Sequence, residues 1–275
     1  MRVTTAIDTG WHPLVDGCPP AWASGWGGDK RGVFCEFSIA DVTQRMRWIP
    51  PGRFRMGSPE DEPGRTEREG PQHEVIIKEG YWLFDTPCTQ ALWQAVMGNN
   101  PSRFQTPTRP VERVSWDDIQ EFLKLINDGN FGLNLKLPSE AQWEYACRAG
   151  TTTALYTGAI EILGENNAPA LDPIAWYGGN SGVDFDLDNG EDSKEWPEKQ
   201  YPHENAGTHP VGLKIANPWR VYDMLGNVWE WCADHWHENY EGAPSDGTPW
   251  LDAGKAGGVR VIRGGLGFRC ARVGS

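Results

Sequence analysis

The stretch Asp223-Met-Leu-Gly-Asn-Val-Trp-Glu-Trp-Cys-Ala-Asp234 combines two tryptophans, a glycine, an amide and three carboxylates in one short run. This mixture is too polar for an ordinary core strand and too aromatic for an ordinary loop. In an extended strand, side chains two positions apart share a face. Trp229 and Trp231 are therefore expected on one side and Glu230 on the other. We interpret the two indoles as core packing rather than as ligand contacts.

The carboxylates of this stretch allow two interpretations. Glu230 and Asp223, together with main-chain carbonyls near Gly226, are the kind of oxygen ligands that calcium takes. Alternatively, both carboxylates accept hydrogen bonds from the N–H groups of an irregular loop. The residues alone favour the second interpretation.

The composition indicates one loop-rich domain. The chain has 275 residues, of which 39% are hydrophobic, and this is enough for a sizeable core. The 33 glycines, 21 prolines and 15 tryptophans predict irregular backbone held by large indoles. A net charge of -13 argues against nucleic acid as a partner, because a negative surface repels phosphate.

The sequence predicts a cytoplasmic protein without a membrane partner. It has no apolar run of the length that spans a bilayer, and residues 1–17 lack the apolar centre of a signal peptide. Its six cysteines form no C-x-x-C pair, which argues against a zinc knuckle and against a dithiol redox motif.

Strands and helices do not alternate regularly along the chain, so the pattern favours an α+β fold. Helices are expected after the capping residues Thr89, Ser115 and Ser139, each followed by apolar residues at helical spacing. Stretches rich in β-branched and aromatic residues predict strands, with turns at the prolines and glycines that interrupt them. These strands are expected within 31–39, 46–56, 73–85, 174–177, 259–265 and 267–273.

Two irregular segments complete the expected organisation. Residues 22–29 are interpreted as a glycine-rich loop whose two indoles plug the core. Residues 183–206 are acidic and are interpreted as a solvated insertion, because their carboxylates do not follow the order of a calcium loop. We expect residues 1–40 to be an N-terminal embellishment packed on a main domain of residues 41–275.

With these pieces in order, the chain resembles the family of sulfatase-modifying, formylglycine-generating enzymes. Six blocks carry the resemblance: Ile49–Ser58, Pro110–Trp116, Leu137–Tyr145, Gly226–Trp231, Arg263–Gly265 and Gly267–Arg269. The resemblance implies a C-type lectin-like fold, loop-rich, with short strands and about three short helices. It also implies a structural calcium ion held by Asp223, Gly226, Val228 and Glu230, the middle two through their carbonyls. Cysteines matching Cys147 and Cys270 are paired in some members, so these two are expected to lie close.

One departure from the family pattern decides the functional expectation. In the oxidases of the family, an interval between Arg-Gly-Gly and Gly-Phe-Arg holds two cysteines that bind copper, whereas here Gly265 is followed directly by Leu266 and Gly267. No two of the six cysteines lie close in sequence, so a copper thiolate pair cannot be built locally, and no copper is expected.

A second branch of the same fold fits this departure. The variable proteins of diversity-generating retroelements share these blocks and use the corresponding interval as a ligand-binding face. The resemblance to them implies a non-catalytic scaffold that binds a protein or other macromolecule. The binding residues would be Arg263, Gly264, Gly265, Leu266 and Phe268. The alternatives are a copper-dependent formylglycine-generating oxidase, an iron-dependent sulfoxide-forming relative, and a purely structural interaction module.

Overall fold

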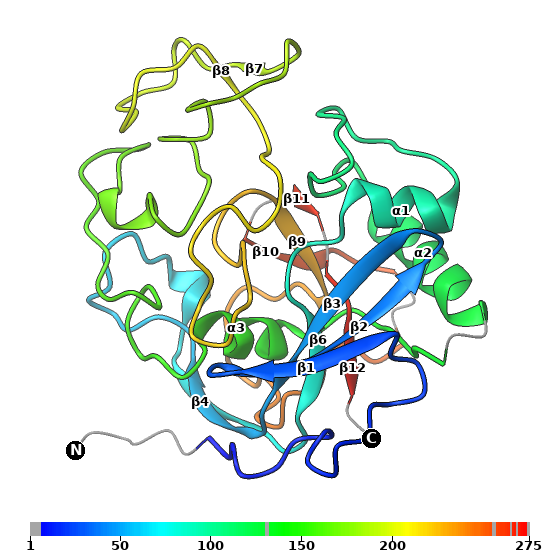
Figure 1. Cartoon of the computed structure of the whole chain (residues 1–275). Coiled ribbons are helices and arrows are strands. Elements are labelled where there is room, and N and C mark those ends of the chain that lie inside the picture. The colour runs from blue at the N-terminus through cyan, green and yellow to red at the C-terminus, as the bar shows by residue number, and fades with distance from the viewer. Residues whose placement is uncertain (1–6, 130–131, 255–256, 265, 268, 274–275) are drawn as a thin grey trace.

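The computed structural model describes residues 7–129, 132–254, 257–264, 266–267 and 269–273. Its largest sheet is antiparallel throughout, in the order β1-β2-β3-β6-β12. The strands are β1 (Gly25–Asp29), β2 (Gly32–Ile39), β3 (Val42–Ile49), β6 (Tyr81–Phe84) and β12 (Ala271–Val273). The first two strands come from the expected N-terminal embellishment, and they lie in the same sheet as strands of the main domain (Figure 1).

Three smaller sheets surround the central one. A three-stranded sheet has the order β10-β9-β11, with β11 parallel to β9. Two hairpins complete the set, β4 with β5 and β7 with β8. The bounds are β4 (Gly52–Met56), β5 (His73–Ile77), β7 (Glu191–Asp192), β8 (Asn205–Ala206), β9 (Trp229–His235), β10 (Arg260–Gly264) and β11 (Leu266–Gly267).

The three expected helices are confirmed, together with their caps. They are α1 (Gln90–Met97), α2 (Trp116–Asp128) and α3 (Glu140–Arg148), and two short 3₁₀ turns are η1 (Glu67–Glu69) and η2 (Pro169–Leu171). The hydroxyls of Thr89, Ser115 and Ser139 each accept a hydrogen bond from a main-chain N–H three residues on. Such caps satisfy N–H groups that the first helical turn leaves unpaired.

Three buried clusters form the core of the described residues, two large ones and a small one of Leu155, Ile174 and Ala175. One large cluster lies between the central sheet and α1 and α2, where Trp93 stacks on Phe122 with ring centroids 5.3 Å apart. The other large cluster joins the β4–β5 hairpin, α3 and β9. The long irregular segment between α3 and β9, green to yellow in Figure 1, extends beyond β9 and β11. Among the described residues, no helix is both long and apolar enough to cross a membrane.

Three local predictions were wrong. Residues 174–177 form no strand, because turn hydrogen bonds to Leu171 and from Asn180 engage both ends, and only Trp176 makes a single bridge, to Gly226. Residues 25–29 form β1 rather than a loop, and Trp26 is 48% exposed, so only Trp22 plugs the core. The expected last strand is divided between two sheets, since β11 pairs with β9 and β12 pairs with β6.

Candidate functional site

The strand β9 separates two environments. Glu230, Cys232 and Asp234 face the interior and are buried. The opposite face carries the two tryptophans, which differ from each other. Trp231 is half-buried and its Nε1 donates to the carbonyl of Val114 at 3.1 Å, whereas Trp229 is 48% exposed. The core-packing interpretation therefore holds for Trp231. It is wrong for Trp229, the first residue of β9, whose side chain is about half exposed.

On the interior face, Glu230 and Arg269 form a fully buried ion pair. Arg269 Nε donates to Glu230 Oε2 and Arg269 Nη2 to Glu230 Oε1, both at 2.6 Å, which is a bidentate arrangement. Glu230 Oε2 also accepts from Trp143 Nε1 at 2.7 Å. The remaining guanidinium hydrogens reach the carbonyls of Phe84, Tyr222 and Asp223.

The residues expected to bind calcium surround this ion pair. Asp223 Oδ2 accepts from the Gly212 N–H at 2.7 Å, and its Oδ1 has no hydrogen-bond partner among the described residues. Burial raises the pKa of Asp223 to about 6. The carbonyl of Gly226 accepts from the Val228 N–H at 2.8 Å.

In this arrangement the Glu230 carboxylate is already engaged by another cation. Arg269 hydrogen-bonds both Glu230 oxygens and the Asp223 carbonyl, so a cation already occupies the position between them. A calcium ion here would require the Arg269 side chain to leave. The calcium site therefore stays a prediction.

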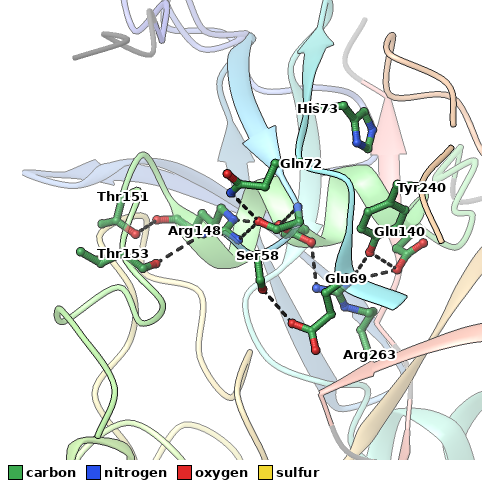
Figure 2. A network of polar contacts seen from close by, with 12 residues as sticks. Ser58, Glu69, Gln72, His73, Glu140, Arg148, Thr151, Thr153, Tyr240 and Arg263 are labelled. Carbon is green, nitrogen blue, oxygen red and sulfur yellow. Dashed lines mark hydrogen bonds and ion pairs between the residues drawn. The ribbon is translucent and has the colours of Figure 1, made fainter. Parts of the chain in front are cut away.

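Arg263, predicted to be displayed to a ligand, lies instead in a network of polar contacts (Figure 2). Its guanidinium donates to Glu140 and Tyr240 and to Glu144 Oε2, at 2.9–3.0 Å. Burial alone would raise the pKa of Glu144, but the charges of Arg263 and Arg148 and the Gly57 N–H lower it below its usual value. In this structure Arg263 ties β10 to α3, and a ligand-binding role for it stays a prediction.

The other predicted ligand-binding residues are only partly described. Gly264 has φ +80°, and a Cβ at this position would lie 3.2 Å from the carbonyl oxygen of Val228. Leu266 belongs to β11, while Gly265 and Phe268 lie outside the described residues. Of this set, the structure places Gly264 at the edge of a cavity.

That cavity, which we call the aromatic cavity, has a volume of about 540 Å³. Such a volume is in the range of small-molecule and side-chain pockets, roughly 300–1,000 Å³. One wall is the Gly226–Trp229 backbone leading into β9. The others come from residues within 103–113, 176–181, 191–196 and 206–208, together with Gly264. Its aromatic members are Phe104, Trp176, Tyr177, Trp196 and Trp229, and its charged members are Arg103, Glu112, Arg113 and Glu191.

Trp176, one of the aromatic side chains that line the cavity, is held in place by His209 and Gly226. Trp176 stacks on His209 with ring centroids 3.7 Å apart, and burial lowers the pKa of His209, which favours its neutral form. Gly226 approaches Trp176 so closely that a Cβ would lie 2.1 Å from the Trp176 carbonyl oxygen. Only glycine fits there, and its φ of +78° also suits glycine.

Two residues that line the aromatic cavity each carry a buried polar atom without a hydrogen-bond partner among the described residues. The Trp176 Nε1 and the Thr208 hydroxyl are buried, and neither has a hydrogen-bond partner among the described residues. By contrast, the Glu112 carboxylate is used by the scaffold, since it accepts from the N–H groups of Arg103 and Phe104. Unpaired buried polar groups are costly, so a ligand that pairs with them gains affinity.

The acidic insertion supplies part of the lining of the aromatic cavity. Asp184, Asp186 and Asp188 are exposed, as expected of a solvated segment, but the alternating Phe185 and Leu187 are half-buried. Two ion pairs hold the insertion to the domain, Arg103 with Glu191 and Arg109 with Asp186. The interpretation as a solvated insertion is thus incomplete, because one side of the segment packs inward.

The cysteines do not form a reactive centre in the aromatic cavity. All six are free, and none of them lines the cavity among the described residues. Cys147 and Cys270 are both buried free thiols that belong to different clusters, and the proximity implied by the resemblance stays a prediction. Burial raises the pKa of Cys88 well above its usual value, and its neighbour in the same cluster, Cys270, raises it further.

Comparisons with known proteins agree with this fold. Residues 36–273 match the family model of the sulfatase-modifying factor enzyme 1-like domain. The chain is 31% identical over 211 residues to the chaperone protein LppX of Paenibacillus barcinonensis, covering 64% of this chain and 70% of that protein. It is 30% identical over 202 residues to the formylglycine-generating enzyme of Thermomonospora curvata, covering 73% of this chain and 57% of the enzyme. The match thus spans little more than half of that enzyme's length.

The family also contains proteins without that activity. The inactive Cα-formylglycine-generating enzyme 2 of Bos taurus is 25% identical over 303 residues, covering 83% of this chain and 88% of that protein. Among solved structures, PvdO from Pseudomonas aeruginosa has a TM-score of 0.64 at 25% identity, covering 91% of this chain and 98% of its own. The Treponema denticola variable protein 1 has a TM-score of 0.61 at 24% identity, covering 88% and 99%, which shows the fold alone. The C-type lectin-like α+β fold expected from the sequence is confirmed, and the chain belongs to the family of the sulfatase-modifying factor enzyme 1-like domain.

Proposed function

We propose that this chain is a ligand-binding member of its family that uses the aromatic cavity to hold a side chain or short segment of a protein or other macromolecule. One observation carries the proposal. The cavity is lined by five aromatic side chains and adjoins Gly264, at the locus where the sequence departs from the oxidase pattern.

The chemistry of the cavity fits recognition better than oxidation. Aromatic faces bind apolar or cationic groups, and the free Trp176 N–H and Thr208 hydroxyl provide orientation. A copper thiolate centre needs two cysteine sulfurs, and the five buried cysteines lie in the core clusters or beside them rather than in the cavity. The inactive relatives show that the family accommodates proteins without this oxidase activity.

Binding can be tested with a displayed library of random peptides, panned against the chain. Peptides that bind are then titrated against Trp229→Ala and against Trp26→Ala. The two tryptophans are a matched pair, because each is 48% exposed and only Trp229 lines the cavity. A tryptophan at the centre of an interface contributes about 2 kcal/mol or more, so Trp229→Ala should weaken binding about thirtyfold and Trp26→Ala should not.

The oxidase alternative is tested on the same preparation. A cysteine-containing sulfatase peptide is incubated with the copper-loaded chain, oxygen and a thiol reductant, and the aldehyde product is measured with a hydrazide probe. We expect no aldehyde. Aldehyde formation above the level of copper alone would overturn the non-catalytic proposal, and selected peptides that bind Trp229→Ala as tightly as the wild type would overturn the assignment of the cavity.

A further inference from the structure

A second cavity, which we call the basic cavity, lies between the turn that joins β1 to β2 and the loop of residues 213–222. The two segments lie side by side in Figure 1, where the loop is drawn in yellow to orange beside the end of β1. The cavity has a volume of about 370 Å³. Its polar lining includes four cationic side chains, Lys30, Arg31, Lys214 and Arg220.

Three of these four cations form no ion pair among the described residues, although the charge of Arg220 contributes, after that of Arg47, to lowering the pKa of Asp29. Lys214 is already paired, since its Nζ donates to the Asp172 carbonyl at 2.6 Å and lies 3.5 Å from Asp172 Oδ1. Asp29, the carboxylate on the same turn as Lys30 and Arg31, is paired with Arg47 at 3.0 Å. Among the described residues, the side chains of Lys30, Arg31 and Arg220 have no ion pair. The chain as a whole is acidic, with a net charge of -13, yet this cavity gathers three cations that form no ion pair within the described part of the chain.

Arg220 is the best positioned of the three. Its Nε is buried and has no hydrogen-bond partner among the described residues. Its backbone is held by the Asn217 turn, because the Arg220 N–H donates to the Asn217 carbonyl at 2.9 Å and Asn217 Nδ2 anchors the turn to the Ala146 carbonyl at 2.6 Å. A guanidinium on a fixed turn with a free N–H is suited to bind an oxyanion.

We propose that the basic cavity binds the phosphate group of a small phosphorylated molecule. The N–H groups of an arginine guanidinium can form two parallel hydrogen bonds to phosphate oxygens. The ammonium group of Lys30 adds positive charge and can bind from several directions. The volume admits more than the phosphate itself. Leu213 and Ile215 on the same loop are 61% and 60% exposed, and they offer an apolar surface to the carbon skeleton of such a ligand.

The proposal is tested by calorimetric titration with inorganic phosphate and with phenyl phosphate, at constant ionic strength set with chloride. Arg220→Gln and Arg31→Gln remove a cavity cation each, and Lys78→Gln removes one exposed charge outside the cavity as the control. We expect saturable binding of both phosphates, tighter for phenyl phosphate, with the dissociation constant raised at least tenfold by Arg220→Gln and unchanged by Lys78→Gln. Circular dichroism checks that each variant is folded.

Two further outcomes separate the sources of the phosphate. Flotation with phosphatidic acid vesicles, against phosphatidylcholine vesicles, tests whether a lipid headgroup reaches the cavity. Vesicle binding that free phosphate fails to displace would overturn the assignment to a small molecule. Two results would overturn the assignment of the phosphate site to the basic cavity. One is a titration with chloride that gives the same heats as phosphate, and the other is phosphate binding that survives both Arg220→Gln and Arg31→Gln.

Discussion

Replacing Arg269 by methionine should strongly destabilise the protein, because it leaves the buried Glu230 carboxylate without its cation. Both side chains are completely buried, and the guanidinium makes two 2.6 Å hydrogen bonds to that carboxylate. After the substitution, Trp143 is the remaining hydrogen-bond donor to Glu230 that the structure shows. Removing one partner of a buried ion pair costs about 3–5 kcal/mol. That is at least about a fifth of the total stability of a typical domain, which is about 5–15 kcal/mol.

The measurement is urea unfolding followed by tryptophan fluorescence. With a slope of about 3 kcal/mol per molar urea, the midpoint should fall by about 1–1.7 M. The control is Lys124→Met, which breaks an exposed ion pair between Lys124 and Asp128 with a 2.7 Å contact. Its midpoint should stay where the wild type has it, because exposed pairs are screened by water.

A double variant distinguishes the lost ion pair from lost packing. Glu230→Gln combined with Arg269→Met removes the buried charge together with its partner, so the pair of substitutions should cost less than the sum of the two single ones. If Arg269→Met alone lowers stability by less than about 1 kcal/mol, then Glu230 is not an uncompensated buried charge in that variant, and the reasoning fails.

The remaining predictions concern Asp223 and the two tryptophans of β9. In the metal-free chain, the pKa of Asp223 is raised from 3.8 to about 6 in the folded state, so folding favours its protonated form. The wild type should therefore lose stability relative to Asp223→Asn as pH rises from 4 to 7. A bound calcium ion would reverse the sign, so stability that rises with pH and falls with EDTA would restore the calcium site. Trp231→Ala should lower the thermal midpoint by several degrees and Trp229→Ala by little, since only Trp231 is packed in the core, and equal losses would contradict this assignment.

The elements that the sequence predicted well are those whose signal is local. Capping side chains and apolar residues at helical spacing lie within one helix, so Thr89, Ser115 and Ser139 mark the helix starts. Alternation and turn residues do the same for the strands β4 and β5, although the sequence did not predict that they pair with each other. The strand expected at 174–177 failed because a short apolar run has no local signal that separates strand from turn, and nearby hydrogen bonds decided it.

The site was less predictable because it depends on distant segments. Phe104, Trp176 and Trp196 come from three loops without periodicity, and only the fold brings them to Trp229. The abundance of tryptophan in irregular segments was the available signal, and it indicates large buried contacts without saying which indoles meet.

The same limitation explains the role of Arg269. In the sequence, Glu230 lies near other residues whose oxygen atoms can bind a cation. This pattern does not tell whether the cation is a metal ion or a basic side chain. The structure shows a guanidinium from a segment 39 residues later in that position, hydrogen-bonding the carboxylate and the Asp223 carbonyl. A buried carboxylate requires a positive partner, and an arginine satisfies this requirement independently of any metal concentration. The buried carboxylate of β9 is thus paired with a cation that is covalently part of the chain.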